Sequence, residues 1–323
     1  MILNDKNIKL FSSIGSRATF GMTALELVKD KKNLMILTSD VSTSAGLDRF
    51  RKNHSKNYLE VGIAEQNLIG LAAGMASEGF DVITTTFSPF QTLRCCEQIK
   101  VNLGYMKEKV IMVGLASGLI LGNLGYTHCS IEDIGVLRSI PNLTILSPAD
   151  CGETAKCIYA AIEHKNSVYI RLTGGSNNKP IYFNDYKFDI GKAHKIINGK
   201  DVSIFATGTM VRNALEASEM LKKKNIHCSV INTHTIKPID EEMIINECKY
   251  SKMIVSVEEH NVIGGLGSSI SEVKSKIKNS PPQLFIGIND SYSQGGDYDY
   301  LKEHFKLDAK NIENTIYEQF RKI

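Results

Sequence analysis

Short runs of β-branched and other apolar residues alternate with longer helical patterns along most of this chain. Buried apolar strands that are separated by helices form βαβ units, and such units build a parallel sheet. We therefore expect an α/β fold whose mainly parallel sheets carry helices on both faces. In the first half of the chain, strands are expected at 33–38, 81–86, 109–115, 142–146 and 167–172, and helices at 65–78, 91–102 and 152–164.

A polar, turn-rich stretch at 173–184 interrupts this alternation. Its run Gly174-Gly175-Ser176-Asn177-Asn178-Lys179-Pro180 is typical of a linker. The sequence therefore predicts two domains, at residues 1–180 and 190–323, and a length of 323 residues agrees with two. In the second domain, strands are expected at 201–206, 227–232, 252–257 and 283–288, and helices at 209–224, 240–248 and 267–278.

The composition argues against several classes of partner. The net charge is only +3, and no block of like charge exceeds a short run such as Lys222-Lys223-Lys224, so the chain has no electrostatic footprint for nucleic acid. The longest apolar stretch, at 110–121, falls short of the roughly 20 residues that span a bilayer. The N-terminus has no apolar signal stretch, and seven cysteines without a CxxC pair are typical of reduced thiols. We expect a cytoplasmic protein without membrane or nucleic-acid partners.

One segment, at 60–76, joins an acidic residue to a helix of small residues. Glu65 stands in the opening turn of that helix, where the helix dipole normally explains an acid. Two neighbouring motifs favour a functional interpretation. Phe87 and Phe90 lie three residues apart at a strand-to-helix junction, and His128 ends a glycine-rich loop. Further motifs stand at 131–133, 137–142, 147–153, 205–208, 236–240, 258–261 and 264–267.

In this order and spacing, the motifs closely resemble the transketolase family. The first half resembles its pyrimidine-binding domain and the second half its C-terminal domain. The resemblance implies thiamine diphosphate as cofactor, and it gives Glu65 the contact with pyrimidine N1′. That contact stabilises the imino tautomer that deprotonates thiazolium C2. We expect a carboxyl that shares a proton with N1′ to be desolvated, with its pKa raised toward neutrality.

The resemblance also implies the other cofactor contacts. Phe90 is expected to stack on the aminopyrimidine, Phe87 to line its pocket, and Asp40 to lie near the cofactor. Each residue has an ordinary structural alternative. The two phenylalanines could be core residues, and Asp40 could form an Asx turn or cap a helix.

The substrate contacts implied by the resemblance involve three residues. His128 matches the second catalytic residue, a histidine over the reacting carbon that donates to the substrate oxygen. Arg17 and Ser44 match two anchors of the substrate's terminal phosphate. A structural loop histidine and a surface arginine are the alternatives for His128 and Arg17.

Three substrate contacts that are usual in transketolases are absent. Leu124 replaces an Asp four residues before the loop histidine, Ala116 replaces a phosphate-binding His, and Thr173-Gly174-Gly175 replaces an Arg after a strand. Charged hydrogen bonds contribute about 1.5–3 kcal/mol each, so phosphate affinity should be weakened. We expect a substrate other than ordinary pentose and hexose phosphates, either unphosphorylated or a larger activated sugar.

The chain offers no clear site for the cofactor's diphosphate. Thiamine enzymes hold it through Mg²⁺ or Ca²⁺ on a Gly-Asp-Gly motif with a later Asn, and the closest match here, Gly296-Asp297-Tyr298, precedes a helix expected at 300–305. Gly264-Gly265-Leu266-Gly267 is either an anion site or a packing turn. We expect no metal site in this chain. An N-terminal transketolase subunit should hold the ion and the diphosphate in an α2β2 heterotetramer.

Two other functions stay open at this point. One is the β subunit of a 2-oxoacid dehydrogenase, and the other is a non-catalytic partner subunit. The Gly-Tyr-Thr-His run that ends at His128 favours a transketolase over the first. The presence of both Glu65 and His128 argues against the second.

Overall fold

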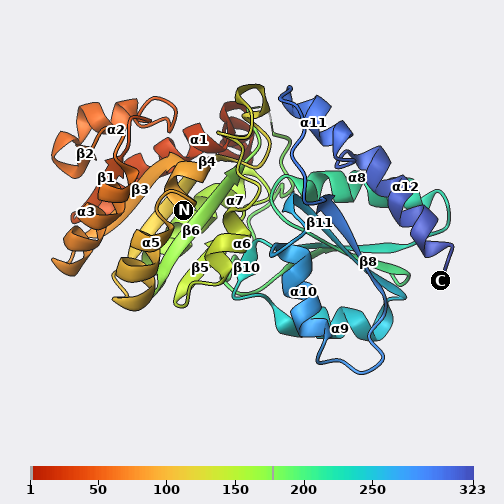
Figure 1. The fold of residues 1–323 in the computed structure, drawn as a ribbon. Helices are drawn as coiled ribbons and strands as arrows, with labels where there is room; N and C mark the ends of the chain where they lie inside the picture. The colour runs from red at the N-terminus through yellow and green to blue at the C-terminus, as the bar shows by residue number, and fades with distance from the viewer. Residues whose placement is uncertain (1–2, 177) are drawn as a thin grey trace.

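The computed structural model describes residues 3–176 and 178–323 and shows two sheets side by side, each with its helices (Figure 1). The predicted linker at 173–184 includes Asn177, which lies outside the described residues. The first sheet consists, in spatial order, of β10 (Thr235–Lys237), β5 (Leu143–Leu146), β6 (Ser167–Thr173), β4 (Val110–Ser117), β3 (Asp81–Phe87), β1 (Leu34–Thr38) and β2 (Tyr58–Glu60). The second consists of β12 (Gln283–Ile288), β11 (Met253–Asn261), β8 (Val202–Ala206), β9 (Cys228–Asn232) and β7 (His194–Ile197).

Both sheets are mainly parallel, and their antiparallel members lie at an edge. In the first sheet only β10 runs antiparallel to its neighbour, and in the second only β7 does so, among the strand pairs of the described residues. Strands buried on both faces explain the long apolar runs in the sequence. The predicted fold class, two mainly parallel sheets with helices on both faces, is confirmed.

The two faces of the first sheet pack against different helices. Ile36 lies in a cluster with Phe20 of α1 (Asp5–Asp30) and Ile158 of α7 (Cys151–Glu163). Its neighbour Leu37 lies in a cluster with Leu68 of α3 (Glu65–Ser77), because successive strand residues point to opposite sides. Shorter elements complete this half: α2 (Asp48–Asn53), η1 (Ser55–Asn57), α4 (Ser88–Thr92), α5 (Cys96–Gln98), η2 (Ile99–Tyr105), η3 (Gly122–Leu124) and α6 (Asp133–Arg138).

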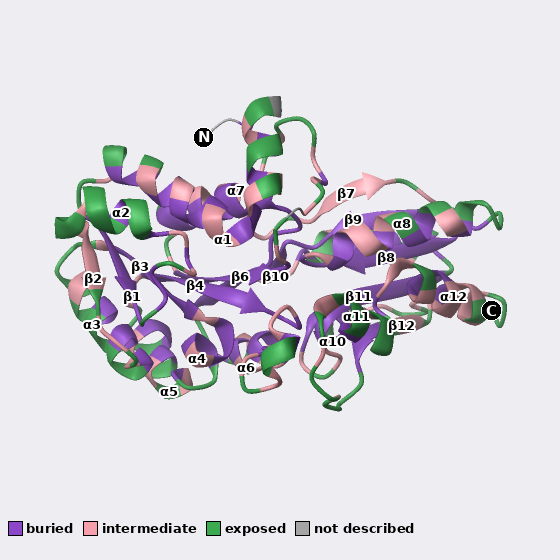
Figure 2. Ribbon diagram, turned by 90° about the horizontal axis from the view of Figure 1, so that it is seen from above, coloured by how far each residue is buried: buried purple, intermediate pink, exposed green. Residues whose placement is uncertain are grey.

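The second sheet repeats this arrangement. Val255 packs in a cluster with residues of α8 (Met210–Lys222) and α12 (Ala309–Phe320), whereas Ile254 packs with α9 (Glu241–Tyr250) and α10 (Leu266–Lys274). The strands of this sheet lie between these helix layers (Figure 1), and most of their residues are buried (Figure 2). The short helix α11 (Tyr298–His304) follows β12.

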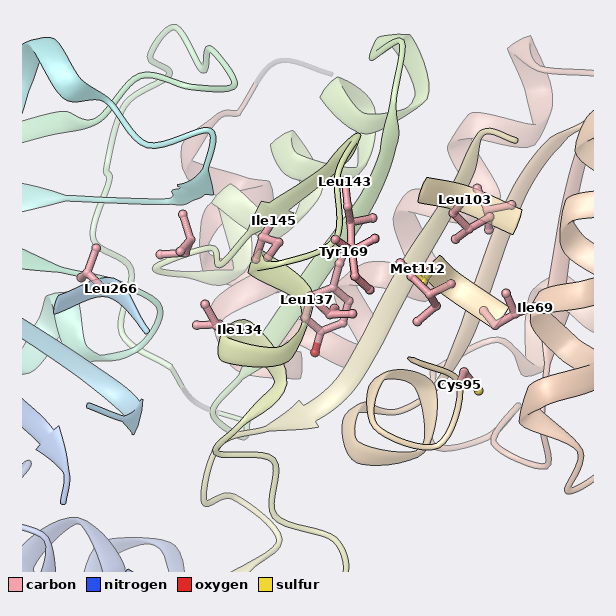
Figure 3. Packing of buried hydrophobic residues seen from close by; sticks show 14 of the residues in the cluster. Ile69, Cys95, Leu103, Met112, Ile134, Leu137, Leu143, Ile145, Tyr169 and Leu266 are labelled. Atoms are coloured by element: carbon pink, nitrogen blue, oxygen red, sulfur yellow. The ribbon is translucent and has the colours of Figure 1, made fainter. Parts of the chain in front are cut away.

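The two halves share a buried interface. Ile134 of α6 extends toward Leu266 of α10 in one continuous apolar cluster (Figure 3). In the same interface, the fully buried Arg171 forms an ion pair with Asp133 at 2.8 Å and donates to the carbonyl oxygen of Glu259 on β11 at 2.8 Å. Burial alone would raise the pKa of Asp133, but the charges of Arg171 and His260 together with the hydrogen bonds from Tyr169 and Arg171 outweigh it and lower that pKa. The domain boundary at 180–190 stays a prediction, since β10 from the second half completes the first sheet.

The single helix expected at 91–102 was wrong. Helix α4 ends at Thr92, α5 covers only Cys96–Gln98, and η2 continues with wider π-type turns. Between α4 and α5, the Cys95 thiol donates to the carbonyl oxygen of Phe90 at 3.2 Å, which stabilises the interruption. Such π segments occur frequently at functional sites. Here the interruption contains Arg94, a residue of the pocket described below.

The glycine run at 264–267 already binds a carboxyl group of the protein itself. The carboxylate of Glu258 accepts hydrogen bonds from the backbone N–H groups of Leu266 at 2.6 Å and Gly267 at 2.8 Å, at the start of α10. A Cβ at Gly265 would lie 2.0 Å from the Glu258 carboxylate, so glycine is required there. The packing interpretation therefore holds, because a side chain fills the anion position.

Two further findings concern the whole described chain. Within residues 3–176 and 178–323, no helix combines the length and apolar character needed to cross a membrane. All seven cysteines lie in these ranges and are free thiols.

Buried His234 should make the fold sensitive to acid. Its ring centroid lies 4.2 Å from that of Phe188, and its Nδ1 lies 3.0 Å from the Thr235 hydroxyl. Burial lowers the pKa of His234 to about 4. The charge of His194 also lowers this pKa, whereas Asp189 and Asp240 raise it by less. In the unfolded chain this histidine binds a proton near pH 6.5, whereas in the folded chain it stays neutral until the pH nears 4. The free energy of unfolding therefore falls as the pH drops from 6.5 toward 4. From pH 7.5 to pH 5 this loss should be about 2 kcal/mol.

Denaturant unfolding of the wild-type chain and His234→Gln at both pH values measures this loss. The variant should lose about 2 kcal/mol less stability on acidification than the wild type does. His304→Gln, at an exposed position, is the matched control and should keep the wild-type pH dependence. Identical pH dependence in the wild type and His234→Gln would contradict the assignment.

Candidate active site

The carboxyl ends of β1, β3 and β4 meet at one edge of the first sheet, where ligands of open parallel sheets usually bind. A pocket of about 230 Å³ opens there. The residues that line it come from segments far apart in the sequence. They are Ser39, Asp40, Val41, Ile63, Glu65, Thr86, Phe87, Phe90, Arg94 and His128.

Glu65 is the buried acid of this pocket. Its side chain is only 4% exposed, and one carboxylate oxygen accepts a hydrogen bond from the Arg94 guanidinium at 2.8 Å. The turn before Glu65 is held by Ser39, whose hydroxyl donates to the carbonyl oxygen of Gly62 at 2.5 Å and accepts from the N–H of Ala64 at 3.2 Å. The end of β1 thereby fixes where α3 begins.

Glu60 holds the two loops that flank Glu65. One carboxylate oxygen accepts from the N–H groups of Asp40 at 2.8 Å and Gly62 at 2.9 Å, and the other accepts from the hydroxyls of Thr38 at 2.6 Å and Tyr58 at 3.1 Å. Burial alone would raise the pKa of Glu60, but these donors outweigh it and lower that pKa. Asp40 is exposed at the pocket wall with φ 55°, a left-handed conformation that Asp tolerates better than most residues.

Three aromatic rings form one side of the pocket. The His128 ring contacts Phe90 edge-to-face, with centroids 5.2 Å apart, and Phe87 at 6.2 Å. Phe87 and Phe90 are themselves 6.4 Å apart and nearly perpendicular. Nδ1 of His128 lies 3.0 Å from the Thr127 hydroxyl, which orients the imidazole. All three rings are only half-buried, so they have surface left for a ligand.

The two predicted phosphate anchors, Arg17 and Ser44, do not line this pocket. They do come from neighbouring segments. A Cβ at Gly46 would lie 3.1 Å from the carbonyl oxygen of Arg17, so the loop after β1 packs against α1. Their role in binding a substrate stays a prediction.

The three positions where usual substrate contacts are absent have different environments. Leu124 is 54% exposed in the loop that leads to His128, and Ala116 is buried near the end of β4. Gly174 adopts φ +72°, and a Cβ there would lie 2.7 Å from Cγ2 of Thr209. The backbone at position 174 therefore leaves no room for an arginine side chain in this conformation.

Sequence reasoning missed the pocket residues Ser39, Val41, Ile63, Thr86 and Arg94, and it missed Glu60, which holds the neighbouring loops. Arg94 follows Phe90 by four residues, and this spacing on a helix face could have indicated that both reach the same pocket. Ser39 and Glu60 act through loop hydrogen bonds, which leave no periodic signal in the sequence.

These residues fit the planar, polar ring of the expected thiamine cofactor. Glu65 offers a buried carboxylate and Phe90 an aromatic face, and the fully buried hydroxyl of Thr86 in the pocket wall has no hydrogen-bond partner among the described residues. Asp297, the acid of the closest match to a diphosphate motif, instead caps α11 by accepting from the N–H of Tyr300 at 2.9 Å. In the part of the chain that the structure describes, no group of three His, Cys, Asp or Glu side chains could hold a metal ion.

Comparison with known families identifies both halves of the chain. Residues 12–178 match the family described as the transketolase pyrimidine-binding domain, and residues 191–312 match the transketolase C-terminal domain. A putative transketolase C-terminal section from Methanocaldococcus jannaschii is 38% identical, and the alignment covers 95% of this chain and 97% of that protein. A subunit of an apulose-4-phosphate transketolase from Phocaeicola vulgatus is 35% identical, and the alignment covers 96% of this chain and 98% of that subunit. A 6-deoxy-6-sulfo-D-fructose transketolase subunit from a Clostridium species is 35% identical, and the alignment covers 94% of this chain and 93% of that subunit.

Solved structures agree with this match. A split-gene transketolase, described as an inactive β4 tetramer, superimposes with a TM-score of 0.86 at 32% identity, covering 96% of this chain and 99% of that one. A transketolase mutant from Pichia stipitis superimposes with a TM-score of 0.79 at 17% identity, which shows the shared fold, and 47% of its length is covered.

Removing the Ser39 hydroxyl should loosen the turn before Glu65. Ser39→Ala deletes the acceptor of the Ala64 N–H and the donor to Gly62, so the free energy of unfolding should fall by about 1–2 kcal/mol. Ser77→Ala is the matched control, because its hydroxyl makes one exposed bond at the far end of α3. It should change stability by less than about 0.5 kcal/mol. Equal effects of the two substitutions in denaturant unfolding would show that Ser39 does not hold this turn.

Proposed function

This chain belongs to the transketolase family, and from that premise we propose that it is the C-terminal subunit of a thiamine-diphosphate-dependent enzyme. The proposed reaction is transfer of a two-carbon ketol unit between sugars. One observation carries the proposal: a buried carboxylate, Glu65, lines a pocket together with the rings of Phe90 and His128. That set fits the cofactor's pyrimidine and a reacting carbonyl group.

Each residue has a separate task in this proposal. Glu65 holds a proton at pyrimidine N1′, and Phe90 provides a face on which the ring stacks, with Phe87 and Asp40 at the pocket wall. His128 donates a hydrogen bond to the substrate oxygen, and its contacts with Phe90 and Thr127 set the direction of its imidazole. Bound thiamine diphosphate would supply the nucleophilic carbon, which no side chain of this chain can offer.

We propose that a partner subunit completes the site. One relative of nearly the same length is named a C-terminal section and another a transketolase subunit, which supports a division of the enzyme into two chains. The sequence has no Gly-Asp-Gly motif, so the divalent cation and the diphosphate would be held by an N-terminal subunit, in an α2β2 assembly. One solved relative is described as an inactive β4 tetramer, as expected for a chain that lacks part of its site. The cytoplasmic location also stays a proposal.

The substrate is proposed to differ from ordinary pentose and hexose phosphates. Leu124, Ala116 and Gly174 replace three usual polar contacts, and the backbone at Gly174 excludes a larger side chain. Two relatives are named for apulose 4-phosphate and for 6-deoxy-6-sulfo-D-fructose, which supports variation of the sugar within this group of subunits.

Replacing Glu65 by Gln should strongly reduce catalysis without removing the fold. An amide has nearly the same shape but cannot exchange a proton with N1′, so kcat/KM of the reconstituted complex should fall by about 10²–10⁴. The assay measures ketol transfer by the complex with its partner. This chain alone should be inactive.

Glu78→Gln is the matched control for this experiment. It makes the same chemical change at an exposed position just after α3 and should retain wild-type activity. Unchanged activity in Glu65→Gln would favour a non-catalytic subunit. Robust activity of the isolated chain would contradict the split-enzyme proposal.

The missing phosphate contacts should be visible in substrate preference. Because charged hydrogen bonds contribute about 1.5–3 kcal/mol each, the complex should not favour xylulose 5-phosphate over unphosphorylated ketols or larger activated sugars. Steady-state kcat/KM values across such a panel measure this. A clear preference for xylulose 5-phosphate over every other ketol would refute the altered-substrate proposal.

A further inference from the structure

Arg94 contacts the two groups that the proposed function reserves for the cofactor's pyrimidine. Its guanidinium lies 2.8 Å from a Glu65 carboxylate oxygen and 4.2 Å from the centroid of the Phe90 ring. Arg94 is 42% exposed and lines the pocket at the carboxyl ends of the strands. Nothing in the family resemblance required an arginine at this position.

A guanidinium and an aminopyrimidine are chemically alike in this setting. Both are flat and both stack on aromatic faces, and the guanidinium offers in-plane N–H groups to a carboxylate as the pyrimidine does at N1′ once that nitrogen carries a proton. We propose that Arg94 is an internal substitute for the aminopyrimidine, which pairs with Glu65 and Phe90 in the chain without cofactor and is displaced when thiamine diphosphate binds. This inference rests on the proposed function and adds a positioning residue to it.

The isolated chain needs such a substitute because Glu65 is buried. A charged carboxylate that is 4% exposed is costly unless a hydrogen-bonded cation accompanies it. Among the hydrogen bonds and ion pairs of the described residues, Arg94 is the one side chain that donates to the Glu65 carboxylate. The ion pair therefore keeps Glu65 in place until a ligand takes over its partner's role.

The structure also gives Arg94 a place to move. A second hollow, of about 300 Å³, lies beside the first and is lined by residues 63–67 and by Arg94. The Arg94 backbone is held there, because the side-chain amide of Gln66 donates to its carbonyl oxygen at 3.1 Å. Displacement therefore requires only side-chain rotation from one hollow into the other.

Removing the substitute should strengthen cofactor binding. Arg94→Met keeps an apolar stem but has no N–H groups, so it cannot compete for Glu65. Calorimetric titration of the full chain with thiamine diphosphate, alone and with its partner subunit, should show affinity tighter by about two- to fivefold in the variant, the scale of one partly exposed ion pair. Arg94→Gln, which keeps one planar donor group, should give a smaller gain. A merely structural arginine would not produce this gain.

Arg51→Met is the matched control, since Arg51 pairs with Asp48 on the surface and lines neither hollow. It should leave the affinity unchanged. Equal or weaker binding by both Arg94 variants would overturn the inference, and circular dichroism of each variant confirms that it is folded. If the assembled complex binds thiamine diphosphate in a Glu65-dependent way but the Arg94 variants bind it no more tightly, the inference about Arg94 is wrong and the proposed function still stands. If no form binds the cofactor, the proposed function fails with it.

Discussion

The site depends on a carboxylate that the fold buries. Glu65 begins α3, where the helix dipole favours an acid, but its burial means that the rest of the pocket must compensate for lost hydration. The ion pair with Arg94 provides that compensation in the isolated chain. The loops around it are fixed by other polar contacts, through Ser39 on one side and Glu60 on the other. A buried acid with a replaceable partner is what a cofactor-binding pocket needs before its cofactor arrives.

The second half of the chain contributes to this pocket without lining it. The loop that carries His128 starts at Gly118 and Leu119, and the Glu259 side chain on β11 accepts from the N–H of Leu119 at 2.6 Å. A Cβ at Gly118 would lie 2.2 Å from the same carboxylate, so this close approach requires glycine. Arg171 links Asp133 of the first half to the carbonyl group of Glu259. The position of His128 therefore depends on how the two sheets dock.

The sequence predicted those features that depend on burial of continuous apolar runs. Strands β1 and β4 contain such runs, and the alternation of strands with helices was sufficient for the fold class. The three-residue strands β2 and β10 were not predicted, because their place in the sheet comes from tertiary contacts and their runs are too short for periodicity. The interruption of the helix around Arg94 was also missed. It is stabilised by the hydrogen bond from the Cys95 thiol to the carbonyl oxygen of Phe90, which leaves no periodic signal in the sequence.

The predicted absence of three usual substrate contacts involves the backbone as well as the side chains. At Leu124 an aspartate could be introduced at little cost, because that side chain is more than half exposed. At Gly174 the positive φ and the contact with Thr209 exclude any branched or long side chain unless the segment after β6 changes its path. That path is in turn tied to the second half, because the Thr173 hydroxyl accepts from the N–H of Thr209 at 3.2 Å. Introducing a phosphate-binding arginine there would therefore require coordinated change at the junction of the two halves, so the proposed change of substrate would depend on how the sheets meet.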